Sequence, residues 1–214
     1  MRKIALFTTI LFLGFLILST AVRAQDKTKE AQKPKTEEKS KSEEKGKTDD
    51  TSIEKITQES IDKCKATEST KPTPKMIMEK IDTACKLIEK EGEASFPKFK
   101  GKDSEFIFAG TYIWIHDAKE SKMLIHPIKP KMEGTIISNM RDSKGKLFFT
   151  EMNKVAKEKG SGWVEYTWPK PGEKDFSNKV SYVKLAKYGD KEYIAGCGVY
   201  DMTVADINKA LGEK

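Results

Sequence analysis

The chain has 214 residues, a formal net charge of +7 and only two histidines. The histidines lack a third ligand at metal spacing, and the chain has no Gly-x-Ser-x-Gly elbow or glycine-rich phosphate loop, so we expect no enzyme, cofactor or metal site. The positive charge favours an anionic small ligand. Nucleic acid is not expected as a partner, because the chain begins with an apparent export signal.

That signal covers residues 1–24. Two basic residues precede an almost unbroken apolar run over residues 4–18, and Val22 and Ala24 provide small side chains before a cleavage site at Gln25. Cleavage would give a periplasmic or secreted protein. The alternative is an uncleaved segment, because residues 4–22 are long enough to span a bilayer and would anchor the protein in the inner membrane.

Residues 25–50 consist largely of Lys, Glu, Thr, Ser and Gln, without any aromatic residue, Val, Ile or Leu. Such a segment cannot bury enough apolar surface to offset its ordering entropy, so we expect a disordered linker. The remaining residues 51–214 are sufficient for one domain with a sizeable core.

A long helix is predicted from about Pro74 to Glu91, with Gly92 as its stop. Its apolar residues recur at helical spacing and form one stripe: Ile77, Ile81, Ala84, Cys85 and Ile88. A shorter helix is expected before it from a second set of apolar residues: Ile53, Ile56, Ile61 and Cys64.

Residues 105–117 are apolar on both sides of an extended strand, which predicts a central strand covered on both faces. Alternation places Phe106, Phe108 and Tyr112 on one of these faces. A turn and a returning strand at residues 123–126 should follow, and then a helix that starts near Leu147 and stops at Gly160.

The last part of the chain predicts three antiparallel strands. Val164, Tyr166 and Trp168 share one side of an aromatic strand, which a Pro-Lys-Pro-Gly segment ends before a second strand begins near Lys179. In the last strand, residues 193–200, two glycines share a face and leave either a hollow beside the aromatic wall or room for close packing or a bulge. The expected fold is α+β, a long helix on a five-stranded antiparallel sheet.

Residues 77–201 resemble the single Cache extracellular sensor domains of bacterial chemoreceptors and histidine kinases. The resemblance is carried by these motifs, in chain order: His126-Pro127, Glu133-Gly134, Leu147-Phe148-Phe149, Gly162-Trp163-Val164-x-Tyr166-x-Trp168-Pro169-Lys170-Pro171-Gly172, Lys179-x-x-Tyr182-Val183 and Gly196-x-Gly198-x-Tyr200-Asp201. It implies a PAS-like fold in which the long N-terminal helix crosses the sheet and the other sheet face holds a small organic acid, such as acetate, propionate or pyruvate.

Members of this family pass the signal on through flanking membrane helices. This chain continues for only a short stretch beyond Tyr200, so we expect a stand-alone exported sensor domain that binds a C2–C4 carboxylate and presents it to a membrane receptor or histidine kinase. The alternative is a structural or protein-interaction module of the cell envelope that binds no ligand.

The polar and aromatic side chains of the predicted strands, together with the resemblance, indicate six candidate ligand-binding residues: His126, Tyr166, Trp168, Lys179, Tyr182 and Tyr112. The histidine and the lysine would bind the carboxylate, and the rings would line the pocket. Each has a structural alternative: a hydrogen-bonding histidine, a solvated lysine, and rings that are simply core. We expect Trp114 to be a core residue.

Three cysteines in an exported chain suggest one disulfide and one free thiol. Cys85 lies on the sheet-facing stripe of the long helix, and Cys197 lies on the strand face assigned to that helix. A Cys85–Cys197 bond is therefore the first expectation. The alternatives are a Cys64–Cys85 bond or no bond at all.

Overall fold

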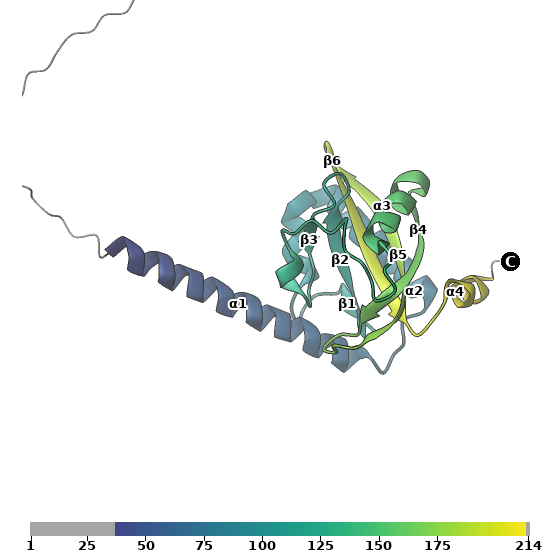
Figure 1. Ribbon diagram of the computed structural model, residues 1–214, viewed down its shortest axis with the longest axis horizontal. Coiled ribbons are helices and arrows are strands. Elements are labelled where there is room, and N and C mark those ends of the chain that lie inside the picture. Colours follow the sequence, from purple (N-terminus) through teal and green to yellow (C-terminus); the bar gives the residue numbers. More distant parts are fainter. Residues whose placement is uncertain (1–36, 213–214) are drawn as a thin grey trace, which may run out of the picture.

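The computed structural model describes residues 37–212 (Figure 1). The predicted export signal and the first part of the predicted linker lie outside these residues. The helices are α1 (Glu37–Thr67), α2 (Pro74–Glu91), α3 (Phe148–Lys159) and α4 (Val204–Leu211), with short 3₁₀ segments at Gly92–Phe99 and Pro130–Met132. The strands are β1 (Ile107–Phe108), β2 (Thr111–Asp117), β3 (Met123–Ile125), β4 (Ser161–Pro169), β5 (Phe176–Tyr188) and β6 (Lys191–Tyr200).

The strands form one antiparallel sheet in the order β1-β2-β6-β5-β4, and β3 also pairs with β2. The α+β class and the long helix on an antiparallel sheet are confirmed. The sixth strand arises because Ala109 and Gly110 both adopt positive φ, 47° and 73°, and turn the chain back on itself. This hairpin corrects our face assignment: Phe106 packs on the opposite side of the sheet from Tyr112.

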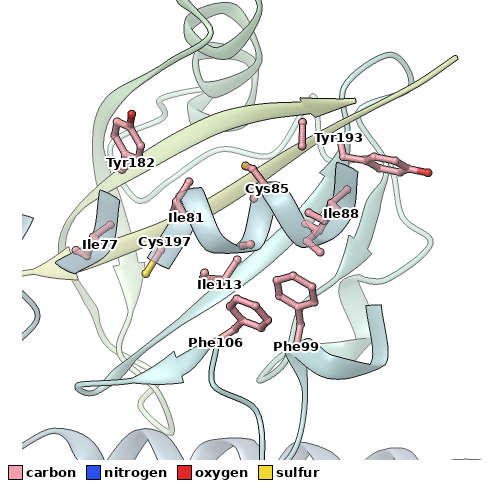
Figure 2. Packing of buried hydrophobic residues seen from close by; sticks show 14 of the residues in the cluster. Ile77, Ile81, Cys85, Ile88, Phe99, Phe106, Ile113, Tyr182, Tyr193 and Cys197 are labelled. Atoms are coloured by element: carbon pink, nitrogen blue, oxygen red, sulfur yellow. The ribbon is translucent and has the colours of Figure 1, made fainter. Parts of the chain in front are cut away.

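Helix α2 begins and ends at the predicted residues. The Thr73 side chain accepts a hydrogen bond from the backbone N–H of Met76, Pro74 takes the first turn, and Gly92 caps the end with a φ of 58°. The predicted stripe is buried against β5 and β6, as Figure 2 shows. We call this side of the sheet the α2 face; its sheet residues include Ile113, Ile115, Val180, Tyr182, Ala186, Tyr193, Ala195, Cys197 and Val199.

The opposite side of the sheet is covered by α3, which ends at Gly160 as predicted, and by the connections around β3. We call it the aromatic face; its buried sheet residues include Tyr112, Trp114, Val164, Tyr166, Trp168, Val183 and Ile194. Phe148 and Phe149 of α3 pack onto this face. The sheet is thus the middle layer of three, and strand alternation decides which side each residue serves.

Helix α1 is longer than predicted, because it begins at Glu37 (Figure 1). Residues 37–50 of the expected linker thus lie within this helix, and their abundant Lys and Glu are good helix formers. The later part of α1 packs against the domain. There Ser60 and Cys64 are buried, and the Ser60 hydroxyl accepts a hydrogen bond from the Gly101 N–H at 2.9 Å. A domain boundary at residue 51 stays a prediction.

The predicted Cys85–Cys197 disulfide is wrong, since all three cysteines are free and buried, which also excludes the Cys64–Cys85 alternative. Cys85 and Cys197 do share the α2 face. However, Cys85 Sγ lies 3.9 Å from the carbonyl of Lys184, whose cross-strand partner Ala195 is two residues from Cys197. Two residues along a strand are about 6–7 Å, so the thiols are out of register for a disulfide.

Candidate functional site

The candidate site lies at the centre of the aromatic face, above Gly196 and Gly198 of β6. The predicted hollow over these glycines is filled by two long side chains. A Cβ at Gly196 would collide with the ring of Trp114, and a Cβ at Gly198 would collide with Ser181 Oγ and the Lys179 side chain. The two glycines therefore make a floor across which Trp114 and Lys179 lie.

Lys179 is the most unusual residue of this face, because its side chain is fully buried among rings. Its Nζ lies 4.6 Å from the ring centroids of Tyr112 and of Tyr200, and 5.4 Å from that of Trp114. It donates one long hydrogen bond, 3.4 Å, to the Tyr112 hydroxyl. None of the ion pairs among the described side chains involves it.

The charge state of Lys179 follows from this environment. Burial, the largest effect, disfavours the ammonium and lowers the pKa of Lys179 to about 7. A carboxylate next to a lysine normally opposes such a shift, but no carboxylate is among the largest effects on Lys179, and no described carboxylate forms an ion pair with it. The ammonium form of Lys179 therefore has no carboxylate partner among the described residues.

A wall of stacked rings closes one side of the site. Tyr166 of β4 stacks on Phe148 of α3 with ring centroids 4.6 Å apart, and Trp168 lies 5.5 Å from the same phenylalanine ring. The Tyr166 hydroxyl shares a hydrogen bond of 3.0 Å with Ser181 Oγ. Besides that hydroxyl pair, the wall carries the indole N–H of Trp168, which hydrogen-bonds the Tyr112 side chain, and its rings are close-packed.

His126 forms the opposite side, directly after β3. Its ring lies 5.2 Å from Tyr112 and 6.3 Å from Trp168, measured between centroids. Its Nδ1 accepts a hydrogen bond from the Lys129 N–H at 3.0 Å, and burial with the nearby positive Lys179 holds its pKa well below the usual value. The neutral ring consequently carries its proton on Nε2, which is a potential donor.

The segment after His126 forms a cover over the rings. Lys129 Nζ lies 4.4 Å from the centroid of the Trp168 ring. Glu133 Oε1 accepts from the His126 N–H at 2.7 Å while its Oε2 pairs with Lys100 at 2.6 Å, so this carboxylate is already engaged. A groove of about 1180 Å³ separates this segment from α1, and a second groove of about 420 Å³ opens beside Tyr200.

The sequence profile of the family described as "Single Cache domain 2" matches residues 36–213. The chain belongs to this family. Cache domains are extracellular or periplasmic sensor domains of chemoreceptors, not catalytic domains, so the domain is a chemosensory one with the PAS-like α+β fold of its family. Within residues 37–212, no helix has the length and apolar character needed to cross a membrane.

A curated relative is the methyl-accepting chemotaxis protein McpP of Pseudomonas putida, which is 41% identical over 90 residues. The match covers 42% of this chain and only 16% of that receptor. Several solved structures are also similar to this chain. One is a periplasmic sensor domain of a chemotaxis protein (29% identity, 59% of this chain, 93% of that chain, TM-score 0.49). Another is a Cache chemosensory domain whose structure is described as the basis for carboxylic acid recognition (34% identity, covering 57% of this chain and 84% of that chain, TM-score 0.47).

Five of the six predicted site residues lie together on the aromatic face of this Cache domain: Tyr112, His126, Tyr166, Trp168 and Lys179. Tyr182 does not, and its assignment to the pocket is corrected. It lies three residues after Lys179 on β5, and this odd spacing places it on the α2 face. There its hydroxyl donates to Ser161 Oγ at 2.8 Å and its ring packs against Trp163.

Three further residues of the candidate site were not selected from the sequence. Tyr200 could have been found, because it shares the face of Gly196 and Gly198. Trp114 also alternates in phase with Tyr112, yet an apolar strand gives no sign that one indole differs from a core ring. Lys129 could not be found, since nothing in the sequence indicates that this lysine lies over a ring.

Proposed function

We propose that this Cache domain binds a small monocarboxylic acid on its aromatic face. The observation that carries the proposal is Lys179, a fully buried lysine without an acidic partner. A buried cation is costly unless it is paired, and a charged hydrogen bond to a carboxylate is worth roughly 1.5–3 kcal/mol. The ligand would supply the counter-ion that the described residues do not.

The residues around Lys179 suit the two ends of such a ligand. The Nε2–H of His126 and the Lys179 ammonium would donate to the carboxylate. The rings of Tyr166 and Trp168 would contact the apolar tail. Because the layer is close-packed, only an acid of two to four carbons fits without a large rearrangement of the face.

Binding would also require a movement of the cover. Lys129 closes the site over Trp168, and its segment borders the large groove next to α1. We infer that the ligand enters by displacing this segment, so that occupancy is communicated towards α1. The occupied domain, exported to the periplasm or held at the inner membrane by its N-terminal segment, would then be read by a membrane receptor or histidine kinase.

A thermal-shift screen of the purified protein tests this proposal. Acetate, propionate, butyrate and pyruvate should each be compared with the matching amide and alcohol. At a ligand concentration of 100 times Kd, a binding acid adds about 2.7 kcal/mol to the free energy of unfolding. Stabilisation by at least one acid and by none of the neutral analogues is expected, whereas no stabilisation by any acid would overturn the proposal.

The close packing of the rings favours a second candidate, a protein-interaction module that retains the fold and binds no small ligand. Phe148, Tyr166 and Lys179 already fill the layer that a ligand would occupy. This candidate predicts that no acid stabilises the domain and that Lys179→Met leaves its interaction with a partner protein unchanged.

A further inference from the structure

Trp114 carries a hydrogen-bond donor for which the described residues offer no acceptor. Its side chain is 2% exposed, and its Nε1 is one of two buried side-chain polar atoms of the described residues without a hydrogen-bond partner. The other is Nδ1 of His116, whose Nε2 bonds Asn153. An unmade hydrogen bond in a buried position is unfavourable, and a phenylalanine at this position would avoid it.

The surroundings of Trp114 indicate what its N–H could bind. The indole lies across Gly196, on the same floor as the Lys179 side chain, and Lys179 Nζ is 5.4 Å from its ring. The ammonium has three N–H groups and one long hydrogen bond, to Tyr112. The indole N–H of Trp114 and the Lys179 ammonium are thus neighbouring donors with too few acceptors among the described residues. A group that only accepts hydrogen bonds, such as a carboxylate, would satisfy both.

We propose that Trp114 is a second anchor for the ligand, donating its Nε1–H to one carboxylate oxygen while Lys179 binds the other. This inference rests on the proposed function. It gives Trp114 a role in specificity, because an ionised carboxylate has two acceptor oxygens, whereas a primary amide turns an N–H₂ donor towards one of these donors. A site with fixed buried donors rejects such an analogue strongly.

The test is a ¹H–¹⁵N NMR titration of the full-length protein with propionate. The chain has three tryptophans, so three indole N–H resonances are expected. The Trp114 resonance is the one absent from Trp114→Phe. If that variant fails to fold, Trp163→Phe and Trp168→Phe assign it by elimination. We expect a downfield shift of the Trp114 indole proton that saturates with propionate and is not produced by propionamide.

Two outcomes separate this inference from the function on which it rests. If propionate and the other C2–C4 acids shift no resonance saturably, both the function and the inference fail. If an acid shifts backbone resonances of the aromatic face saturably and the Trp114 indole N–H stays in place, the function stands and the inference alone is overturned; a water bound to Nε1 in place of the ligand gives this second result.

Affinities provide a second measurement. We expect Trp114→Phe to weaken acid binding by about 10- to 100-fold, the loss of one hydrogen bond to a charged group. The matched control is Trp163→Phe, because Trp163 packs on the α2 face against Tyr182 and should leave the affinity unchanged. In the double variant with Lys179→Met, the two losses should not add, since both side chains bind one carboxylate. Fully additive losses would contradict the inference.

Discussion

The two faces of the sheet are formed by alternate residues of the same strands, but they differ in the polar groups that they bury. On the α2 face, the buried stripe of α2 meets aliphatic and aromatic side chains, and none of the described residues buried in this cluster is charged. The aromatic face buries Lys179 and the indole N–H of Trp114, neither of which has its expected partner among the described residues, and next to them the neutral His126. On the α2 face, the tyrosine hydroxyls have hydrogen-bond partners: Tyr182 donates to Ser161 and Tyr193 donates to Glu93.

The aromatic face, in contrast, buries polar groups that lack partners among the described residues, and this difference suggests which face binds a ligand. Apolar rings could cover that face more favourably than a buried lysine and an unpaired N–H. Groups that cost stability and fulfil no structural role are typical of a binding site. The comparison therefore supports the proposal that the α2 face provides stability and the aromatic face binds the ligand.

The largest expected effect is on the α2 face. Ile81 is fully buried on the stripe of α2, so Ile81→Ala should lower the free energy of unfolding by about 2–5 kcal/mol. Chemical denaturation measures the loss, and acid affinity of the folded protein should not change. Ile136→Ala is the control, because Ile136 is 59% exposed and its truncation should cost less than about 0.5 kcal/mol. Similar losses for both variants would contradict this division of roles.

Lys179 of the aromatic face should determine the pH dependence of stability just above neutral pH. The pKa of Lys179 is about 7 in the folded protein, whereas the ordinary value of 10.5 applies to the unfolded chain. Between these two pH values the unfolded chain therefore binds more protons than the folded protein at this residue. The free energy of unfolding should accordingly rise with pH from about 7 to 8, by up to about 1.4 kcal/mol per pH unit. Above this range the thiols of Cys64, Cys85 and Cys197, whose pKa burial raises from 9.0 to about 12, keep their protons in the folded state and oppose the rise. Below pH 7 this contribution is constant. Lys179→Met should remove the rise, and an unchanged slope in that variant would contradict the assignment.

Ligand affinity should depend on Lys179 more than on Lys129. Lys179→Met removes the buried ammonium and should weaken acid binding by about 10- to 100-fold, the equivalent of 1.5–3 kcal/mol. Lys129→Met is the matched control, because Lys129 is only partly buried and contacts the outer ring of Trp168. Titration calorimetry near pH 6 measures both. Equal losses would show that general positive charge, not a specific pair, attracts the acid.

The smallest expected effect is that of removing a tyrosine hydroxyl, and it should differ between two tyrosines on opposite faces of the sheet. Tyr166 and Tyr182 each share one hydroxyl hydrogen bond with a serine, at 3.0 and 2.8 Å. Replacing either with Phe should cost about 0.5–1.5 kcal/mol of stability. Only Tyr166→Phe should change acid affinity, because only Tyr166 lines the proposed site. A change of affinity in Tyr182→Phe would mean that the site extends to the α2 face.

Much of this fold could be predicted because periodicity is a local property. The stripe of α2, its proline start and its glycine end are all contained in adjacent residues, and the structure confirms both helix ends. The turn at Ala109 was missed because a non-glycine residue with positive φ has no reliable sequence signal. That single turn moved Phe106 to the other face.

The site was less predictable because it depends on distances between elements. Alternation alone would have excluded Tyr182, but motif resemblance outweighed it. The register that separates Cys85 from Cys197 is set by how α2 lies on β5 and β6, which the sequence does not specify. The missing partner of Trp114 is likewise visible only when all neighbours are placed.

The most direct test of the account is the number of protons taken up when an acid binds. At pH 8 most of Lys179 should be neutral in the free domain, and pairing with a carboxylate should restore its proton. Titration calorimetry with propionate in two buffers of different ionisation enthalpy measures this uptake. The account predicts uptake approaching one proton per bound acid, absent in Lys179→Met. Binding of the acid without proton uptake, or no binding at all, would contradict it.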